Sequence, residues 1–374
     1  MIRKLNRRFQ DYMREKRLKI GKYIWDRKEK AEIIRGNSFI EDNDIKSIIF
    51  MRYDGKIGDM VVNTLMFREI KKFYPNIKIA VVTKGAARDI IKNNPYVDKI
   101  YNYETNSKNI KKLASEIALE KYDLLIDFSE MLRVNQMMLI NLSKARFNIG
   151  LDKKDWKLFD ISLNSNEDFQ WNEHITQRYL SYLKKLGLKI KEIDLSYDVF
   201  LEKSNKYQEF FKTIENKRIL ILNPYGASKH KSLNLNSLIK IIKYLEKFEI
   251  CVVLIYFGDK YKELKILAKD NRHLYIPKNI NSIQDSVYLI SKAEYVVSPD
   301  TSIVHIASAL KKKIVSVYPP NGGKYGVDHL VWAPLGENVQ MLFCEDKKSS
   351  YDEIDINTFS WSEMKKAIDN AINQ

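Results

Sequence analysis

Short apolar runs alternate with longer amphipathic segments twice along the 374 residues, and this alternation is the feature that most constrains the fold. It is typical of βαβ units, in which helices join parallel strands and cover both faces of a sheet. A chain of this length is too long for one ordinary hydrophobic core and sufficient for two. The sequence therefore predicts two α/β domains, each of them doubly wound and Rossmann-like.

The first domain is expected over residues 46–200 and the second over residues 201–374, preceded by a helical extension over residues 1–45. Whether the last helix crosses back to the first domain stays open. In doubly wound folds the ligand binds at the carboxyl ends of the strands, so we expect a cleft there between the two domains. The predicted strands are Ser47–Met51, Ile77–Val82, Lys99–Tyr103, Tyr122–Phe128, Arg146–Gly150, Arg218–Asn223, Ile250–Tyr256, Leu274–Ile276, Tyr295–Ser298 and Ile314–Tyr318.

Positive charge is concentrated at the start of the chain. Residues 1–36 contain thirteen Lys or Arg and five Asp or Glu, so half of the formal net charge of +16 lies there. Their apolar residues recur at helical spacing, which predicts a basic amphipathic helix. This helix either packs on its own protein or lies on an anionic membrane surface, and the sequence does not separate the two.

Several classes of protein are disfavoured. A nucleic-acid-binding protein would carry its basic residues across the folded body, interleaved with aromatic residues, and no nucleic-acid motif is present. The two cysteines, Cys251 and Cys344, form no CxxC pair, so neither a disulfide framework nor a zinc site is expected. Residues 1–20 lack the apolar core of a secretory signal, and the run 251–257 is too short to span a bilayer. We expect a cytoplasmic protein, with peripheral attachment to the inner face of the cytoplasmic membrane as the alternative that residues 1–36 offer.

The loop after the first predicted strand ends in Asp59. Gly55 and Gly58 allow a tight turn, and Asp59 then projects from the start of a helix toward the predicted cleft. A carboxylate in this position is placed to accept a proton; the alternative is that Asp59 only caps or charges the helix start. The loop lacks the spacing of the dinucleotide-binding fingerprint, and the chain contains no P-loop.

The corresponding loop of the second half, residues 222–233, has small residues, the hydroxyl of Ser228 and the cations Lys229 and Lys231 where a strand gives way to a helix. This composition suits an anion pocket, with a solvated basic turn as the alternative.

A third loop joins the strand that ends near Ser298 to the next helix. Asp300 or Thr301 suits the N-cap of that helix, and His305 lies one turn further on. The arrangement predicts a grip for a diphosphate, whereas a histidine satisfied within the core is the plain alternative.

Taken in this order, the three loops resemble those of the glycosyltransferase family 9 heptosyltransferases of bacterial lipopolysaccharide assembly, which have the GT-B fold. The resemblance covers about residues 46–320. Its segments are Arg52–Asp59 with Asn63-Thr64-Leu65 and Tyr74-Pro75, Tyr122–Asp127, Asn223–Ala227 with Lys231, and Ser298–His305, the last being the most specific. The chain departs from the family pattern at Ser302, usually glycine, at Ser232-Leu233, usually aromatic in part, and at Tyr225, which interrupts Asn-Pro-Gly.

The resemblance implies a role for each matched residue. Asp59 is the expected general base, and Lys231 with Ser228 is expected to hold the donor phosphates. The other residues expected on the donor side are Gly58, Asn223, Asp300, Thr301, Ser302 and His305, with Glu263 as a ribose ligand, and those on the acceptor side are Arg52 and Asp127.

The resemblance implies an inverting transferase that moves a sugar, with heptose from ADP-heptose as the leading candidate, to an acceptor hydroxyl of a lipopolysaccharide or lipooligosaccharide core. The acceptor would be a glycolipid or oligosaccharide. Neither a cofactor nor a metal is expected, because Asp42-Asn43-Asp44, the one Asp-x-Asp pattern considered, precedes the first strand and is expected to be a solvated turn. The alternatives are a GT-B transferase of another sugar or onto a protein, a nucleotide-sugar epimerase and, as the weakest, a nucleic-acid-binding protein.

Overall fold

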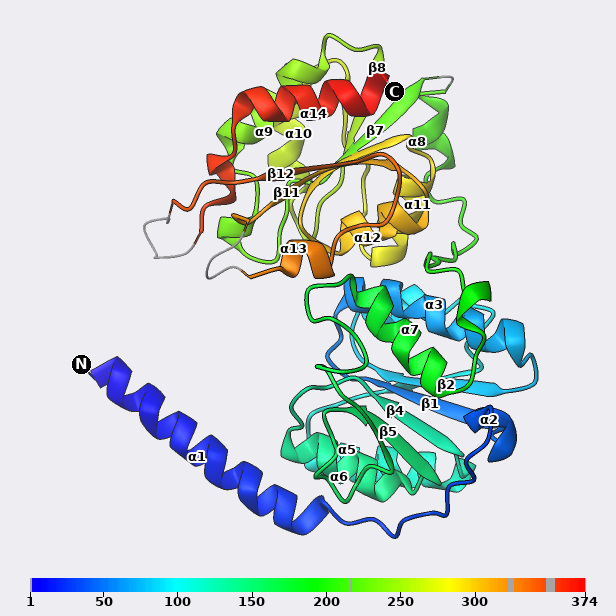
Figure 1. Ribbon diagram of the computed structural model, residues 1–374. Helices are drawn as coiled ribbons and strands as arrows, with labels where there is room; N and C mark the ends of the chain where they lie inside the picture. Colours follow the sequence, from blue (N-terminus) through cyan, green and yellow to red (C-terminus); the bar gives the residue numbers. More distant parts are fainter. Residues whose placement is uncertain (1, 216, 322–325, 348–353, 374) are drawn as a thin grey trace. The chain divides into compact units, whose positions relative to one another are not determined.

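The computed structural model describes residues 2–215, 217–321, 326–347 and 354–373. Contacts between residues divide the chain into two compact units (Figure 1). The first unit comes from the part of the chain that ends at Asp194, and the second from Leu195 onward. Two short segments of the first half, Lys56–Leu65 and Asp89–Asn94, group with the second unit.

The first unit contains a six-stranded sheet in which every neighbouring pair is parallel, in the order β3-β2-β1-β4-β5-β6. In Figure 1, α5 and α6 cover one face and α3 and α7 the other. The strands are β1 (Ser47–Arg52), β2 (Lys78–Thr83), β3 (Lys99–Asn102), β4 (Leu124–Asp127), β5 (Phe147–Leu151) and β6 (Ile161–Leu163), and the helices are α1 (Ile2–Trp25), α2 (Phe39–Asp42), α3 (Ile57–Phe73), α4 (Ala87–Ile91), α5 (Ser107–Glu120), α6 (Val134–Ser143) and α7 (Ile175–Lys185). The residues of α3 up to Leu65 and those of α4 from Asp89 onward group with the second unit.

The second unit contains another parallel six-stranded sheet, in the order β12-β11-β10-β7-β8-β9. Counted from its own first strand, this order is the same as that of the first sheet. Its strands are β7 (Arg218–Leu222), β8 (Ile250–Leu254), β9 (Leu274–Tyr275), β10 (Tyr295–Pro299), β11 (Lys313–Tyr318) and β12 (Val339–Phe343), and its helices are α8 (Gln208–Lys212), α9 (Leu235–Leu245), α10 (Tyr261–Lys269), α11 (Ile283–Ser291), α12 (Ser302–Ala309), α13 (Asp328–Val331) and α14 (Trp361–Asn373).

The ten predicted strands are present, and the fold class is confirmed. Two strands lack a sequence signal: β6 has three residues, and β12 alternates only weakly between buried and exposed positions. The last helix, α14, packs on the second sheet, and the carbonyl of Ile372 accepts a hydrogen bond from Arg218 at 3.2 Å.

Helix α1 packs against α6 through its C-terminal half. A methyl group built on Gly21 would lie 2.6 Å from a Val134 methyl, so only glycine allows the two helices to approach this closely. Leu18 and Trp25 pack against the hydrophobic core of the first unit. The C-terminal half of α1 therefore packs on its own protein, which is one of the two alternatives for the basic helix.

The chain after α1 is also tied to the first unit. The Asp26 carboxylate accepts a hydrogen bond from the Leu158 amide at 2.8 Å, and Lys28 forms a 2.6 Å ion pair with Asp160. Among the described residues, no helix has both the length and the apolar character that crossing a bilayer requires.

Candidate functional site

Strands β7 and β10 are neighbours in the second sheet, and the connections from them turn away in opposite directions. This is the topological switch point, where open α/β sheets bind ligands. Asn223, at the end of β7, is fully buried. Its amide nitrogen donates hydrogen bonds to the Tyr225 carbonyl and the Ser298 hydroxyl, both at 2.9 Å. Asn223 therefore holds the loops after β7 and β10 together and contributes to the site by positioning them.

The loop after β7 doubles back on itself. A methyl group on Gly226 would lie 1.8 Å from the carbonyl oxygen of Lys231, so glycine is required there. The Ser232 hydroxyl accepts a hydrogen bond from the Gly226 amide at 2.9 Å and donates one to the Ser228 carbonyl at 2.8 Å. Ser232, one of the departures from the family pattern, thus stabilises this loop through two hydrogen bonds. Ser228 and Lys231 are exposed on it, where a ligand can reach them.

The loop after β10 leads into α12, whose N-cap is Thr301. The Thr301 hydroxyl accepts a hydrogen bond from the Ile303 amide at 3.3 Å, which confirms the predicted cap. Ser302, the first residue of α12, is half-buried. Burial raises the pKa of Asp300 to about 6, while the positive charge of Lys231 acts in the opposite direction. The loops after β7 and β10 are joined directly by the hydrogen bond between Asn223 and Ser298.

His305 is 5% exposed, and its ring centroid lies 6.2 Å from that of Tyr197 and 6.2 Å from that of Trp332. The ring also lies against Gly58, because a methyl group there would be 2.8 Å from His305 Cδ2 and 3.6 Å from the Ser302 Cα. The glycine loop that carries Asp59 thus reaches the first turn of α12. His305 is thus a buried residue that borders the start of α3, and its predicted part in binding a diphosphate stays a prediction.

Asp59 lies in the first turn of α3, where the positive end of the helix dipole favours a negative charge. Its side chain is 16% exposed, and its carboxylate is 3.9 Å from the ammonium of Lys56. The structure thus brings the Asp59 loop to Ser302 and His305 and leaves the carboxylate partly accessible.

Glu263 lies in the first turn of α10 and is exposed, with its carboxylate 2.9 Å from the ammonium of Lys260. Burial raises the pKa of Tyr225 to about 12, and the negative charge of Glu263 adds to this shift. The Tyr225 ring packs edge-on against Phe257, with 6.4 Å between centroids, and Phe257 is 47% exposed. The sequence prediction missed this aromatic pair, although the extra Tyr225 within Asn-Pro-Gly was a signal.

The first sheet has its own switch point, between β1 and β4, and charged residues gather there in the interior. Asp127 is fully buried at the end of β4. It accepts hydrogen bonds from the Tyr53 hydroxyl and, at 2.8 Å, from the Ser129 amide. Burial raises the pKa of Asp127 to about 7, although the Ser129 hydrogen bond and the charges of Lys153 and Arg52 oppose the shift.

Arg52 and Lys153 complete this buried cluster. The Arg52 guanidinium lies over the Phe128 ring, 5.2 Å from its centroid, and 3.7 Å from the carboxylate of Asp54. The Lys153 ammonium donates hydrogen bonds to the carbonyls of Ser129, Glu130 and Leu151 at 2.6–2.9 Å. The two predicted acceptor-side residues, Arg52 and Asp127, are thus both buried near the ends of β1 and β4.

No group of three or more His, Cys, Asp or Glu side chains within the described ranges is arranged to hold a metal ion. Asp42 and Asn43, from the Asp-x-Asp pattern, instead accept hydrogen bonds from the amides of Ser38 and Ile34.

Comparisons with known proteins agree with this arrangement. The model of glycosyltransferase family 9 (heptosyltransferase) matches residues 110–354, and a family of unknown function matches residues 16–186. Lipopolysaccharide heptosyltransferase 3 of Escherichia coli K12 is 23% identical over 305 residues, which cover 77% of this chain and 85% of that protein.

Solved structures show the same fold. The E. coli ADP-heptose lipopolysaccharide heptosyltransferase II superposes with a TM-score of 0.67 at 15% identity, over 88% of this chain and 99% of that one. The E. coli heptosyltransferase WaaC with ADP gives a TM-score of 0.67 at 15% identity, over 87% of this chain and all of that one. The two parallel-sheet domains are therefore those of the GT-B fold, and the chain belongs to glycosyltransferase family 9 and is a glycosyltransferase.

Proposed function

We propose that this glycosyltransferase transfers a heptose from ADP-heptose, with inversion at the anomeric carbon, to a hydroxyl of a lipopolysaccharide or lipooligosaccharide core. The names of its relatives support the sugar and the acceptor, and WaaC with ADP supports the nucleotide. One observation carries the proposal within this chain: Gly58 lies against His305 and Ser302, so the start of α3, which carries Asp59, meets the first turn of α12.

In the proposed reaction the Asp59 carboxylate takes the proton of the acceptor hydroxyl. The acceptor oxygen then attacks the anomeric carbon of the donor, and the bond between that carbon and the β-phosphate oxygen breaks. The electron pair leaves with the nucleoside diphosphate. General-base catalysis of this kind contributes about 100- to 10,000-fold to a rate.

The leaving diphosphate is proposed to bind Lys231, Ser228 and the first turn of α12. Lys231 supplies a full positive charge, and the backbone amides and hydroxyls of Thr301 and Ser302 supply hydrogen bonds at the positive end of the helix. Because these groups stabilise the charge that develops on the leaving group, we propose that transfer requires no divalent metal.

The nucleoside is proposed to lie on the pair formed by Tyr225 and Phe257, with Glu263 accepting hydrogen bonds from the ribose. The exposed face of Phe257 suits a nucleobase, and the nearby carboxylate suits sugar hydroxyls. On the acceptor side, Arg52 and Asp127 are proposed to act from the interior by fixing the shape of the surrounding loops.

The experiment is a thermal-shift comparison of ADP, UDP, GDP and CDP, followed by transfer assays with the matching sugars. Ligands that bind the native state raise its stability in proportion to ln(1 + [L]/Kd), so ADP should give the largest shift. The configuration of the product, read by NMR, tests inversion. Turnover of the donor without any acceptor would support an epimerase and contradict the proposal.

We also propose that the protein works in the cytoplasm and binds the inner membrane surface peripherally through residues 1–36. Residues Phe9, Tyr12, Ile20 and Tyr23 support this, because their side chains are 52–77% exposed on a basic helix.

A further inference from the structure

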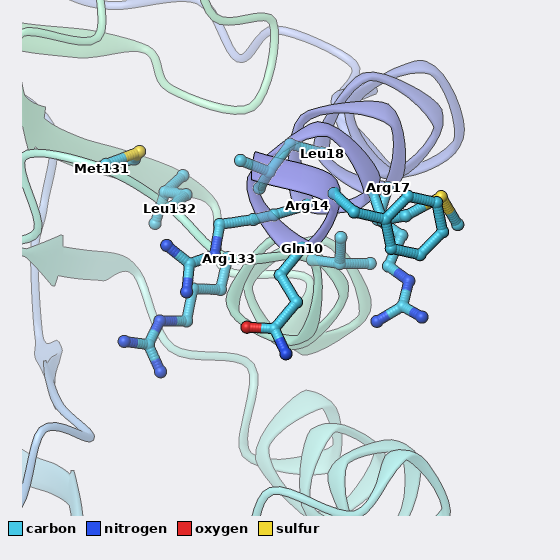
Figure 2. Close-up of a pocket in the computed structure, with 10 residues that line it drawn as sticks. Gln10, Arg14, Arg17, Leu18, Met131, Leu132 and Arg133 are labelled. Carbon is cyan, nitrogen blue, oxygen red and sulfur yellow. The ribbon is translucent and has the colours of Figure 1, made fainter. Parts of the chain in front are cut away.

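A cavity of about 810 Å³ opens between α1 and the segment that leads into α6. Figure 2 shows Gln10, Arg14 and Arg17 projecting from α1, and Leu132 and Arg133 lying on the opposing segment. We call it the α1–α6 pocket. It lies within the first unit and is lined by α1, which precedes the residues that the glycosyltransferase family 9 model matches, and the transfer reaction as proposed makes no use of it.

The polar side of the α1–α6 pocket is cationic. Arg14, Arg17 and Arg133 line it, and none of its ten described lining residues is an Asp or Glu. Arg17 and Arg133 form no ion pair with any described residue. Arg14 is 3.9 Å from Asp11, but both side chains are more than half exposed, so this contact neutralises little charge. Three guanidinium groups around one cavity suit a phosphate.

Each wall of the pocket also carries apolar residues, and two of them are exposed at the surface. Phe9 is 62% exposed and Met131 is 73% exposed, and both line the pocket. Phe9 is separated from Ile20 by eleven residues, about three helical turns, so both lie on one face of α1, away from the face that Leu18 and Gly21 pack on α6. A free inorganic anion would bind the arginines and leave these apolar side chains in water. An amphiphile with a phosphate headgroup would bind the arginines through its phosphate and cover the apolar side chains with its hydrocarbon part.

A second basic cavity, at the other end of α6, provides a contrast. It is lined by Arg27, Lys28, Lys30, Lys144 and Arg146. Four of these cations already have partners in the protein. Lys28 pairs with Asp160, and the other three donate hydrogen bonds to carbonyls: Arg27 to Tyr23, Lys30 to Phe159 and Arg146 to Asn43. That cavity holds the chain that follows α1 against the first unit, whereas within the described ranges the guanidinium groups of Arg17 and Arg133 form no ion pair.

We propose that the α1–α6 pocket binds the phosphate headgroup of an anionic membrane phospholipid while the exposed apolar face of α1 enters the bilayer interface. The inference rests on the membrane attachment proposed above and specifies its ligand and residues. One face of α1 then packs on α6, and another face binds the membrane.

The test is co-sedimentation of the full chain with vesicles of phosphatidylcholine alone and of phosphatidylcholine with phosphatidylglycerol. Arg17→Gln/Arg133→Gln removes two pocket cations, each of which adds about 1 kcal/mol near an anionic surface, so binding to the mixed vesicles should fall by about 10- to 30-fold. The matched control, Lys108→Gln/Lys112→Gln, removes two exposed cations of α5 and should change binding less than about threefold.

Two further arms separate the alternatives. Phe9→Ser should weaken binding to the mixed vesicles, whereas a free-phosphate site would be insensitive to it and would instead be displaced by millimolar inorganic phosphate. Equal losses in the pocket and control variants would show charge attraction without a site and would overturn the inference. Circular dichroism checks that every variant is folded.

Transfer to a water-soluble acceptor analogue should be unchanged in the pocket variant, because the pocket takes no part in the proposed chemistry. Loss of vesicle binding with transfer retained supports the inference. Transfer that is absent even in the wild type would contradict the proposed function and leave the vesicle result standing.

Discussion

The two sheets have the same strand order, yet the polar residues at their switch points behave in opposite ways. At the ends of β1 and β4, the side chains of Arg52, Asp127 and Lys153 are 0–5% exposed and contact groups in the interior of the first unit. At the end of β7 and β10, a buried Asn223 secures the loops, and Ser228 and Lys231 stay exposed. The strand order predicts where a ligand site can lie. Whether the polar side chains there are exposed to a ligand depends on the hydrogen bonds and ion pairs that they form within the protein.

The physical reason lies in the cost of burying charge. A buried carboxylate needs hydrogen bonds and nearby cations, and Asp127 obtains them from Tyr53, Ser129 and Lys153. Tyr53, Ser129 and Lys153 are therefore occupied with contacts inside the first unit. The second unit instead uses the neutral amide of Asn223 for the same structural purpose, which leaves its cations free to meet an anionic substrate.

The largest effect is expected for Asp59→Asn. The amide keeps the shape of the carboxylate but cannot accept the acceptor proton, so kcat should fall by about 100- to 10,000-fold while the Kd for donor stays nearly the same. Steady-state kinetics and donor titration measure the two quantities. The control Asp44→Asn changes an exposed carboxylate that pairs with Lys46 in a turn before β1. Activity within a few-fold of wild type would remove Asp59 from the mechanism.

The buried carboxyl groups should make stability depend on pH in both units. A carboxyl whose pKa is raised on folding stabilises the native state fully below its unfolded value and loses that contribution as the pH rises through the folded value. For Asp127, with a pKa of about 7, the loss between about pH 4 and pH 8 is up to about 4 kcal/mol.

Urea unfolding at a series of pH values checks this dependence. Relative to wild type, Asp127→Asn should flatten the curve up to about pH 7. Asp300→Asn should flatten a narrower window that ends near pH 6, because the pKa of Asp300 is raised only to about 6. Parallel curves for wild type and Asp127→Asn would show that Asp127 ionises as freely in the native state as in the unfolded chain.

Lys231→Ala tests the open cations of the second unit. Loss of a charged hydrogen bond to phosphate costs about 1.5–3 kcal/mol, so kcat/KM should fall by about 10- to 150-fold, with weaker donor binding. Lys229→Ala, in the same exposed turn, is the control and should change kcat/KM by only a few-fold. Wild-type activity should survive EDTA, and Mg²⁺ should not rescue Lys231→Ala. Activity that EDTA abolishes and Mg²⁺ or Mn²⁺ restores would contradict the metal-free mechanism and point to Asp300 as a ligand.

The smallest effect is expected for Gly226→Ala. The new methyl group would overlap the Lys231 carbonyl, so the loop must shift at a cost of about 1–3 kcal/mol. Donor affinity should fall while the thermal stability of the first unit stays unchanged, as measured by donor titration and calorimetry. Ala227→Gly, at the next position, is the control. Unchanged donor affinity in Gly226→Ala would show that the fold of this loop is not needed to present Lys231.

The sequence by itself determined the two parallel sheets and the order of the three loops, because strand-length runs and helix periods are local patterns. It also narrowed the N-cap of α12 to Asp300 or Thr301, of which the structure selects Thr301, and it located the glycines before Asp59. The sequence did not predict the weakly patterned strands β6 and β12, because their position depends on pairing with the neighbouring strands β5 and β11 rather than on their own residues.

Only the tertiary structure decided which polar residues are exposed. The contacts Asn223–Ser298, Tyr53–Asp127 and Gly58–His305 join residues 74 or more positions apart, and no local pattern specifies them. The same holds for α1, whose periodicity allowed either a packed or an exposed helix. Gly21 against Val134 settled the packed face, because a close approach of two helices depends on the residue that each presents to the other.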